Sequence, residues 1–443
     1  MKQQYNCIVM GAAGRDFHVY LSFLRGNEHF RVKAFTATQI PFITERNFPK
    51  SLAGPAYDED IPIHDESELP ELIEKHDVDF VFFAYSDISH ADLMHKSSLV
   101  QAAGASFVIA GPDHTQVPSA KPVVSITATR TGAGKSPLTQ HLARFLTDRG
   151  IKVAVIRHPM PYGNLEMQAV QRFATTQDLV DHECTIEERE EYEPYVDMGI
   201  PIYAGVDYQG ILDESSKEAD IVLWDGGNND FSFIRPDLDI VVVDSLRAGH
   251  EIDYFPGEVN FRRADVLVIG KVNSAAPGAV DGIRDRAKEL NPDAVICTSD
   301  LDLEIEDPGL LNGNKVLVIE DGPTVTHGGM AVGAGSVAAR RHDAIPVEPR
   351  QYAVGTIADT YDAYPHMTHI LPAMGYNDDQ RNDLAATINA CAKAEGISCV
   401  VDASPARLDR MLQLDVPLAR VSYRFKQLDG QPLEERVLAL LED

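Results

Sequence analysis

The sequence is poor in cysteine, in basic residues and in long apolar runs. Its five cysteines are scattered without a Cys-x-x-Cys pair, which argues for a reducing cytoplasm and against a cysteine-based metal site. No apolar run approaches the roughly 18 residues of a membrane span, and the N-terminus lacks the features of a signal peptide. Only 39 Lys and Arg residues oppose 68 Asp and Glu residues, giving a formal net charge of −29. Such a surface repels phosphate backbones and anionic lipids, so we expect a cytoplasmic protein without nucleic-acid or membrane partners.

Short β-branched runs alternate with longer helical stretches along almost all of the 443 residues. Many of these runs are continuously apolar, which is typical of parallel strands covered by helices on both faces. The pattern predicts an α/β fold with a Rossmann-like parallel sheet in residues 1–120. A second α/β domain is expected over 121–345, and a mixed α/β extension over 346–443. The two boundaries are placed at the proline-rich stretches before Val123 and near 345–350.

The segment from Val123 to Ser136 has the organisation of a phosphate-binding P-loop. An apolar strand enters a glycine-bearing loop that ends in Gly134-Lys135-Ser136, and a helix follows. Glycines let backbone amides approach phosphate, the lysine reaches the β- and γ-phosphates, and the serine hydroxyl can hold Mg²⁺. Thr129 stands where the standard pattern has glycine, so the loop resembles that of dethiobiotin synthetase and its relatives. A turn without function is the alternative, which the strand–loop–helix setting disfavours. The domain over 121–345 is therefore predicted to be a P-loop NTPase domain, with nucleotide-binding residues Thr131, Gly132, Ala133, Gly134, Lys135 and Ser136.

A P-loop needs an acid at the end of a later buried strand, and Asp225 fits this requirement. We expect it to hold Mg²⁺ together with Ser136, although a plain strand-ending turn would look the same. A further strand ends in Gly270-Lys271-Val272-Asn273, where guanine-specific proteins usually have Asn-Lys-x-Asp. Both polar anchors of that motif differ, which favours ATP over GTP. Lys271 and Asn273 are nonetheless predicted to contact the nucleotide.

The first strand enters a Gly-x-x-Gly turn formed by Gly11 and Gly14. Asp16 replaces the third glycine of the dinucleotide fingerprint, and the next strand ends in threonines instead of an acid, so a nicotinamide dehydrogenase is disfavoured. The turn suits a phosphate or carboxylate, unless it is purely structural. Candidate substrate-binding residues near it and on the third strand are Gly11, Gly14, Arg15, His18, Ser86 and His90, for which helix capping is the alternative.

Three further segments carry polar residues. Arg157 and His158 end the strand after the P-loop helix, where open α/β sheets bind ligands, and Arg172 follows. The acidic run from Glu187 to Glu191 is interpreted as a solvated helix face. A glycine-rich segment in the C-terminal half follows a strand that ends in two acids, and we interpret it as a site loop. Its candidate residues are Glu320, Thr326 and His327.

Together, five segments resemble the cyclic 2,3-diphosphoglycerate synthetase family, and the resemblance runs from residue 6 to about residue 380. The segments are Gly11–His18, Thr131–Ser136, Arg157–Gly163, Trp224–Asp230 and Glu320–Met330. Members of that family have a motif like Asn-Lys-Val-Asp where this chain has Gly270 to Asn273. The resemblance implies ATP-driven closure of 2,3-bisphosphoglycerate into a cyclic pyrophosphate, with Mg²⁺, releasing ADP and phosphate.

The residue-level interpretation and the resemblance agree on an ATP- and Mg²⁺-dependent enzyme acting on a small anionic phosphorylated substrate. We expect one substrate phosphate to attack the γ-phosphoryl group of ATP, and the other phosphate to close the ring. The assigned catalytic residues are Lys135, Asp225 and Arg130; the metal ligands are Ser136, Asp225 and Glu320; the substrate cations are Arg15, Arg130, Arg157, His158 and Arg172. A homo-oligomer is expected. The alternatives are a GTP- or ATP-hydrolysing switch or metallochaperone, and a ligase or kinase for another anionic small molecule.

Overall fold

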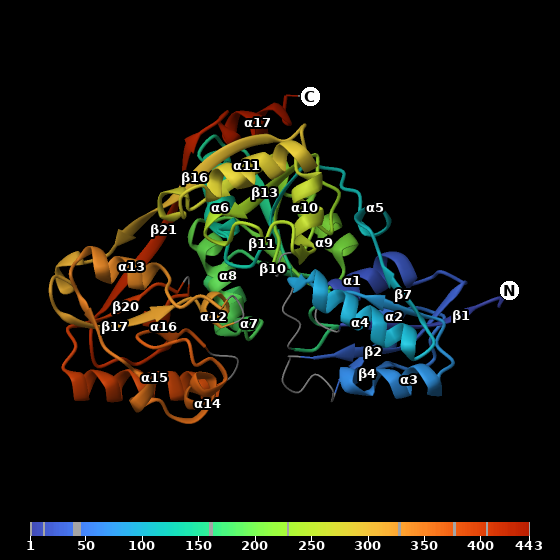
Figure 1. Cartoon of the computed structure of the whole chain (residues 1–443), viewed down its shortest axis with the longest axis horizontal. Coiled ribbons are helices and arrows are strands. Elements are labelled where there is room, and N and C mark those ends of the chain that lie inside the picture. Colours follow the sequence, from blue (N-terminus) through green and yellow to red (C-terminus); the bar gives the residue numbers. More distant parts are fainter. Residues whose placement is uncertain are drawn as a thin grey trace.

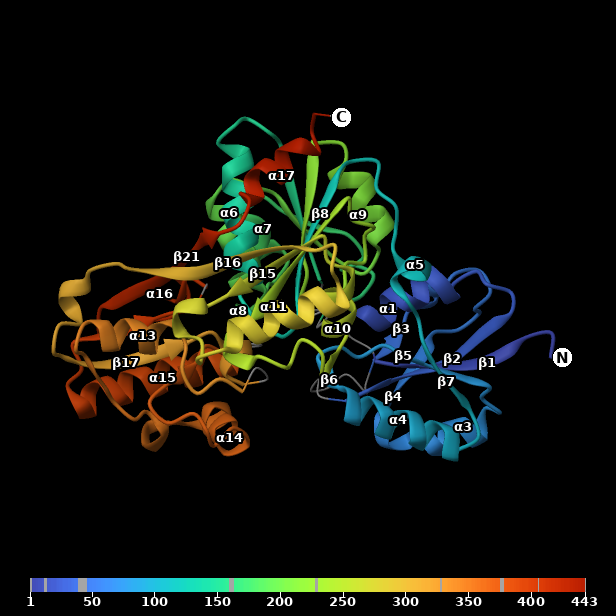
Figure 2. The same cartoon turned by 45° about the horizontal axis from the view of Figure 1, so that its top comes forward.

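The computed structural model describes residues 2–11, 14–38, 46–158, 163–227, 230–326, 329–374, 378–404 and 406–442. It has three lobes, coloured blue, green to yellow, and orange to red from the N-terminus in Figure 1. The outer two lobes lie on opposite sides of the central one, and the rotated view in Figure 2 shows the same arrangement. The α/β fold class with largely parallel sheets is confirmed.

The N-terminal lobe is a six-stranded sheet, parallel except at the edge strand β3. Side chains alternate along β1: Cys7 and Val9 join the core on one face, while Ile8 and Met10 join the core on the other. Helices therefore cover both faces, as the continuous apolar runs predict. In sheet order the strands are β3 (Asn47–Phe48), β4 (Ile61–Asp65), β2 (Phe30–Ala37), β1 (Tyr5–Met10), β5 (Phe80–Phe83) and β7 (Ser106–Ile109). The helices are α1 (Arg15–Val19), α2 (Lys50–Ala53), α3 (Leu69–Lys75), α4 (His90–Ala102) and α5 (Pro112–Thr115).

The central lobe is built on parallel strands with β8 in the middle, between β12 and β13. Because parallel strands end at one edge, the ends of β8, β9, β12, β13 and β15 lie along the same side of the sheet. The strands in sheet order are β10 (Gln171–Phe173), β11 (Ile202–Ala204), β9 (Val153–Arg157), β12 (Ile221–Asp225), β8 (Val123–Ala128), β13 (Leu238–Asp244), β15 (Val266–Gly270) and β16 (Val295–Ile305). The helices are α6 (Lys135–Thr147), α7 (Thr176–Asp181), α8 (Ile186–Asp197), α9 (Tyr208–Ser215), α10 (Gly257–Arg263) and α11 (Ala279–Leu290).

The C-terminal lobe continues the same sheet through a long antiparallel ribbon of β16 and β21, visible in Figure 1 as the link to the orange lobe. Its single core runs from Leu311 to Val421, so it extends across the boundary expected at 345/346. Leu433 and Val437 return to the core of the central lobe. The strands are β17 (Lys315–Glu320), β18 (Ile345–Pro346), β19 (Leu371–Pro372), β20 (Cys399–Asp402) and β21 (Leu418–Asp429); the helices are α12 (Gly322–Val325), α13 (Ala334–Arg341), α14 (Gly355–Ala363), α15 (Asp378–Glu395), α16 (Leu408–Met411) and α17 (Leu433–Ala439).

The N-terminal lobe is joined to the central lobe beside the P-loop. Strand β6 (Ile88–Ser89) of the first lobe pairs antiparallel with β14 (Tyr254–Phe255) of the second. An isolated bridge between Val117 and Ile234 adds a second connection. All five cysteines are buried free thiols. Within the described ranges, no helix combines the length and the apolar character that crossing a bilayer requires.

Candidate active site at the P-loop

The loop between β8 and α6 has the backbone shape of a phosphate-binding loop. Gly132 and Gly134 have φ angles of 76° and 110°, which L side chains rarely adopt. The loop thereby curls over the N-terminus of α6, where backbone N–H groups and the helix dipole favour an anion. The predicted nucleotide-binding residues from Thr131 to Ser136 form this loop and the start of the helix.

Lys135 opens α6 and is only 8% exposed. Burial lowers its pKa to about 8, and the neighbouring guanidinium of Arg157 acts in the same direction. A phosphate group at the loop would favour the charged form, because opposite charges stabilise each other. Within the protein, the carboxylates of Asp225, Asp87 and Glu191 act in the same direction as such a phosphate and raise the pKa of Lys135.

The structure brings Asp225 and Ser136 together, as the sequence predicts. Asp225 ends β12 and is fully buried. Its Oδ1 accepts hydrogen bonds from Ser136 Oγ at 3.4 Å and Thr139 Oγ1 at 3.2 Å. Its Oδ2 accepts one from Tyr195 at 2.7 Å and lies 2.9 Å from Nη1 of Arg157. The carboxylate is therefore fixed beside the serine hydroxyl.

This pair fits a Mg²⁺ ion that arrives with a nucleotide. A hydroxyl and a carboxylate oxygen are hard ligands, and Mg²⁺ keeps several waters and takes phosphate oxygens for the remaining positions. Among the described residues, no group of three His, Cys, Asp or Glu side chains could hold a metal by itself. Glu320 does not join this pair: its carboxylate accepts from the N–H groups of Gly333, Gly335 and Ser336 and from the Ser336 hydroxyl, at the start of α13. It closes a loop of the C-terminal lobe.

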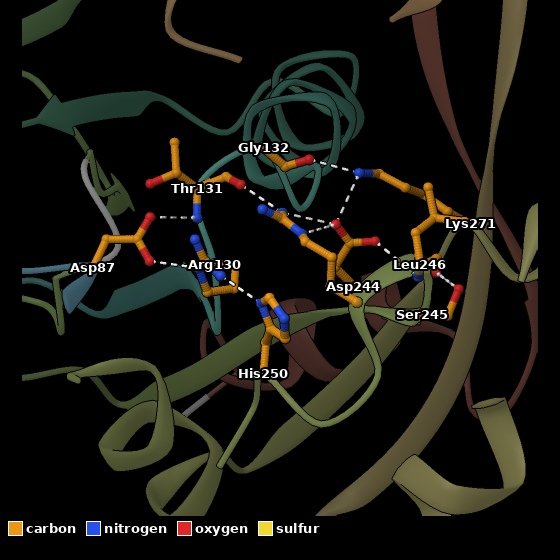
Figure 3. Close-up of polar contacts among 11 residues, drawn as sticks. Asp87, Arg130, Thr131, Gly132, Asp244, Ser245, Leu246, His250 and Lys271 are labelled. Carbon is orange, nitrogen blue, oxygen red and sulfur yellow. Dashed lines mark hydrogen bonds and ion pairs between the residues drawn. The ribbon is translucent and has the colours of Figure 1, made fainter. Parts of the chain in front are cut away.

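Lys271 contacts the backbone of the P-loop (Figure 3). It follows β15, which lies on the other side of β8 from β12, the strand that ends in Asp225. Its Nζ donates to the carbonyl oxygen of Gly132 at 2.6 Å and to Asp244 Oδ2 at 3.2 Å. Arg247, bound to the same carboxylate, donates to the carbonyl oxygen of Thr131 at 2.6 Å. Asn273 follows two residues later, and its N–H donates to Asp300 at 3.2 Å. Lys271 therefore fixes the loop, and Asn273 lies on the neighbouring turn.

Arg130, the second residue of the loop, points to the N-terminal lobe. Its Nε donates to Asp87 at 2.6 Å, its Nη1 contacts Nδ1 of His250, and its guanidinium lies 3.6 Å from the centre of the Tyr254 ring. The predicted Ser86 directly precedes Asp87. His90 forms a separate contact between lobes, with Glu258 at 3.5 Å.

A second meeting point of the two lobes lies at the end of β1. Arg15 is 2% exposed, and its Nη1 lies 3.8 Å from Asp230 Oδ1. His158 lies 3.3 Å from the other oxygen of that carboxylate, and a Cβ on Gly14 would meet its ring at 2.0 Å, so only glycine fits there. The predicted Arg15, Gly14 and His158 therefore converge around Asp230.

The turn itself is less open to an anion than its glycines suggest. The N–H of Gly14 donates to the Asp16 carboxylate at 3.0 Å, and Gly11, with φ 124°, lies against the same side chain. His18 stacks on Phe233 with ring centres 4.2 Å apart, and burial lowers its pKa to about 3. It is a neutral ring in an aromatic cluster and supplies no positive charge.

Two other predicted substrate residues lie elsewhere. Arg172 forms a two-point contact with Glu218, which precedes β12 and so lies at the opposite end of that strand from Asp225. Thr326 donates to the carbonyl oxygen of Gly322 at 2.8 Å. His327 falls outside the described residues. Thr324 of the same segment does approach the P-loop, 3.7 Å from where a Cβ of Gly132 would stand.

The interpretation of the acidic run as a solvated face is wrong. Glu187, Glu188 and Glu190 are buried, because α8 lies between the central lobe and the C-terminal lobe. Glu191 forms an ion pair with Arg157, with Nε to Oε2 at 2.6 Å. Burial and the nearby Asp321 raise the pKa of Glu190 well above its usual range. Helix α8 is thus part of the site wall.

Sequence reasoning missed the residues that other elements bring to the loop. Tyr254 is part of the β6–β14 ribbon, Asp87 directly precedes β6, and His250 lies before β14. Asp230 ends the segment Trp224–Asp230, where it contributed only to the family resemblance. The positive φ of Asp87, 55°, is a structural feature with no sequence signal of its own.

No family model matches the sequence. Over 438 residues, the chain is 50% identical to the arginine synthetase ArcE of Thermococcus kodakarensis; the match covers 99% of this chain and 97% of that protein. Among solved structures, LpxK of Aquifex aeolicus in complex with ATP has 13% identity and a TM-score of 0.40, covering 74% of this chain and 89% of that one. HypB of Archaeoglobus fulgidus has 18% identity and a TM-score of 0.28, covering 41% and 81%. The sequence match to the arginine synthetase thus includes all three lobes.

Proposed function

Because the chain belongs to the family of the arginine synthetase ArcE, we propose that it synthesises arginine in an ATP-dependent reaction. The coarser conclusion, an ATP-dependent ligase with a P-loop, follows from this membership and from the loop at Lys135. We infer the substrates from the relationship to an arginine synthetase and from the chemistry of arginine.

The chemistry of arginine restricts the reaction. Its guanidinium carbon bears three nitrogens and no oxygen. A P-loop enzyme activates an oxygen by attaching the γ-phosphoryl group to it. The fitting precursor is therefore a ureido amino acid, whose carbon bears one oxygen: the Pγ–O bond to ADP breaks, and a Pγ–O bond to the ureido oxygen forms. An amine nitrogen then attacks the carbon, the C–O bond breaks, phosphate leaves and a proton is released.

Residues at the P-loop have matching roles in this proposal. Lys135 and Arg130 stabilise the negative charge on the transferring phosphoryl group. Ser136 and Asp225 would hold Mg²⁺, which would supply charge neutralisation at the phosphates. Arg15 and His158 remain candidates for the anionic end of the substrate, here an amino-acid carboxylate.

The observation that carries the proposal is the charge balance around the loop. Each predicted substrate cation on this side of the sheet has an acidic partner: Arg15 and His158 share Asp230, Arg130 has Asp87, and Arg157 has Glu191 and Asp225. Binding a bisphosphate of charge about −5 requires cations in excess, because charges buried without partners are costly. A zwitterionic amino acid with a neutral ureido group needs no such excess.

Synthesis of cyclic 2,3-diphosphoglycerate remains the second candidate, favoured by the five segments that resemble that family. It uses the same P-loop and the same release of ADP and phosphate. A hydrolysing switch, a metallochaperone, or a kinase for another small anion is the third possibility. These alternatives differ from arginine synthesis in the compound that accepts the γ-phosphoryl group.

The test is to incubate the purified protein with Mg²⁺ and ATP in three arms: citrulline with ammonium, 2,3-bisphosphoglycerate, and no acceptor. Released ADP and phosphate are followed by ³¹P NMR, and arginine by mass spectrometry. We expect arginine and phosphate in equal amounts in the first arm alone, with less product when GTP replaces ATP. A cyclic diphosphate signal in the second arm, or equal hydrolysis in all arms, would reject the proposal.

A further inference from the structure

The guanidinium of Arg130 is held on three sides by side chains that do not belong to the P-loop. Figure 3 shows two of them, Asp87 and His250. Asp87 accepts from its Nε at 2.6 Å, Nδ1 of His250 contacts its Nη1, and the face of Tyr254 lies 3.6 Å from its carbon. The ring of His250 stacks on that of Tyr254 with centres 4.8 Å apart. The side chains of Arg130 and Asp87 are only 11% and 16% exposed. We call Asp87, His250 and Tyr254 the cradle.

Each cradle residue recognises a different feature of a guanidinium. A carboxylate accepts its N–H groups and matches its charge, and an aromatic face stacks on its plane. Burial and the adjacent Arg130 lower the pKa of His250, so its ring is neutral at pH 7. Since arginine can only donate, Nδ1 of that neutral ring is the acceptor and the ring proton is on Nε2.

The cradle lies directly against the phosphate-binding loop. The second oxygen of Asp87 accepts from the N–H of Thr131 at 3.3 Å, so the carboxylate bridges the cradle and the P-loop backbone. A planar group held by Asp87 would therefore lie beside the P-loop backbone, where we expect the phosphates of a nucleotide. That is where a ureido oxygen must be to receive the phosphoryl group.

We propose that the cradle of Asp87, His250 and Tyr254 is the subsite for the planar ureido or guanidinium end of the substrate and product, and that Arg130 occupies it as an internal mimic. The proposal rests on the proposed function, because it assumes a substrate that ends in such a group. When a triphosphate binds, its charge draws the Arg130 guanidinium to the phosphates, and the cradle opens to the substrate. ATP and amino acid then bind in a favoured order, nucleotide first.

The decisive variant is Arg130→Ala, which removes the mimic and leaves the cradle. We expect it to bind arginine about 10-fold or more tightly than wild type when no nucleotide is present, by calorimetry, since a hydrogen-bonded competitor is gone. It should also bind guanidinium ion, used as a probe at millimolar concentration. A purely structural Arg130 predicts the reverse, weaker binding of every ligand.

The second variant, Asp87→Asn, should weaken arginine binding in the presence of ADP by about 10- to 100-fold, because it removes the charged acceptor. ATP binding should be unchanged or stronger. Tyr254→Leu should lower arginine affinity about two- to fivefold. The control is Asp113→Asn, which breaks another Asp–Arg pair, with Arg263 at 3.0 Å, on the exposed surface. The melting temperature of each variant is measured in parallel.

If wild type binds arginine but none of the cradle variants alters its affinity, the inference is wrong and the proposed function stands. If Arg130→Ala binds guanidinium while wild type neither binds nor forms arginine, the cradle stands and the proposed function fails. If Arg130→Ala weakens both ligands, Arg130 is a structural contact and the inference is overturned.

Discussion

The buried charged groups on the two sides of the P-loop have different surroundings. On the N-terminal side each buried cation faces an acid, as Arg15 faces Asp230. On the C-terminal side carboxylates crowd together, and burial raises the pKa of both Glu188 and Asp402 to about 7. The ion pairs of the N-terminal side stay charged and suit a polar ligand. The carboxyl groups of the C-terminal side bind protons more readily than exposed carboxyl groups do. The following predictions test that difference.

The largest effect is expected at the loop that the two sides share. Lys135→Ala should lower turnover about 10²–10³-fold while the fold remains intact, because it removes a stabiliser of transferring charge. Steady-state kinetics and circular dichroism check this. Retention of more than about a tenth of wild-type turnover would contradict the assignment.

On the N-terminal side, where buried cations face acids, removal of one member of an ion pair should destabilise the protein. Arg15→Met should lower the free energy of unfolding by about 3–5 kcal/mol, because Asp230 is then buried without its guanidinium. Adding Asp230→Asn should restore much of that stability, as measured by denaturant unfolding.

The variants of Arg15 and Asp230 also distinguish a structural role of Arg15 from a role in substrate binding. If Arg15 holds the substrate carboxylate, the double variant regains stability but not affinity for the amino acid, while ATP binding stays close to wild type. Full recovery of amino-acid affinity in the double variant would make Arg15 a contact between lobes only.

On the C-terminal side, where carboxyl groups lie close together, removal of one of them should not destabilise the protein. Glu190→Gln removes a carboxyl whose charged form is disfavoured by burial and by Asp321. We expect the free energy of unfolding at pH 7.5 to stay the same or to rise by up to about 1 kcal/mol. A loss comparable to that of Arg15→Met would mean that Glu190 has a cationic partner and that the comparison is wrong.

A further contrast is expected in the pH dependence of stability. Glu188 and Asp402 bind protons more tightly folded than unfolded, so stability falls as pH rises from about 4 towards 7 and then levels. The melting temperature should therefore be a few degrees higher at pH 5.5 than at pH 7.5. The double variant Glu188→Gln and Asp402→Asn should show a smaller change of melting temperature with pH. An unchanged pH dependence would mean that other groups cause it.

The sequence allowed the P-loop to be predicted because its parts are contiguous. Strand, glycines, Lys135 and Ser136 occur within one segment, and the geometry follows from local rules. Asp225 could be found as an acid at the end of an apolar strand, because parallel strands share one edge.

The rest depends on packing between lobes, which has no local signal. Asp87 reaches Arg130 only because β6 pairs with β14, 165 residues apart in the register of Ser89 and Tyr254. Helix α8 looks solvated in isolation, and it is buried by a C-terminal lobe whose position the sequence does not reveal. Arg172 stands near the P-loop strands in the sequence but on the wrong end of the sheet.

In the proposed reaction, the γ-phosphoryl group passes to a ureido oxygen at this P-loop. This transfer is tested most directly with citrulline labelled with ¹⁸O in the ureido group, incubated with ATP, Mg²⁺ and ammonium. We expect the label to appear in the inorganic phosphate released, one atom for each arginine formed, because the C–O bond breaks after phosphorylation. Arginine formation with unlabelled phosphate, or release of AMP and pyrophosphate, would contradict it.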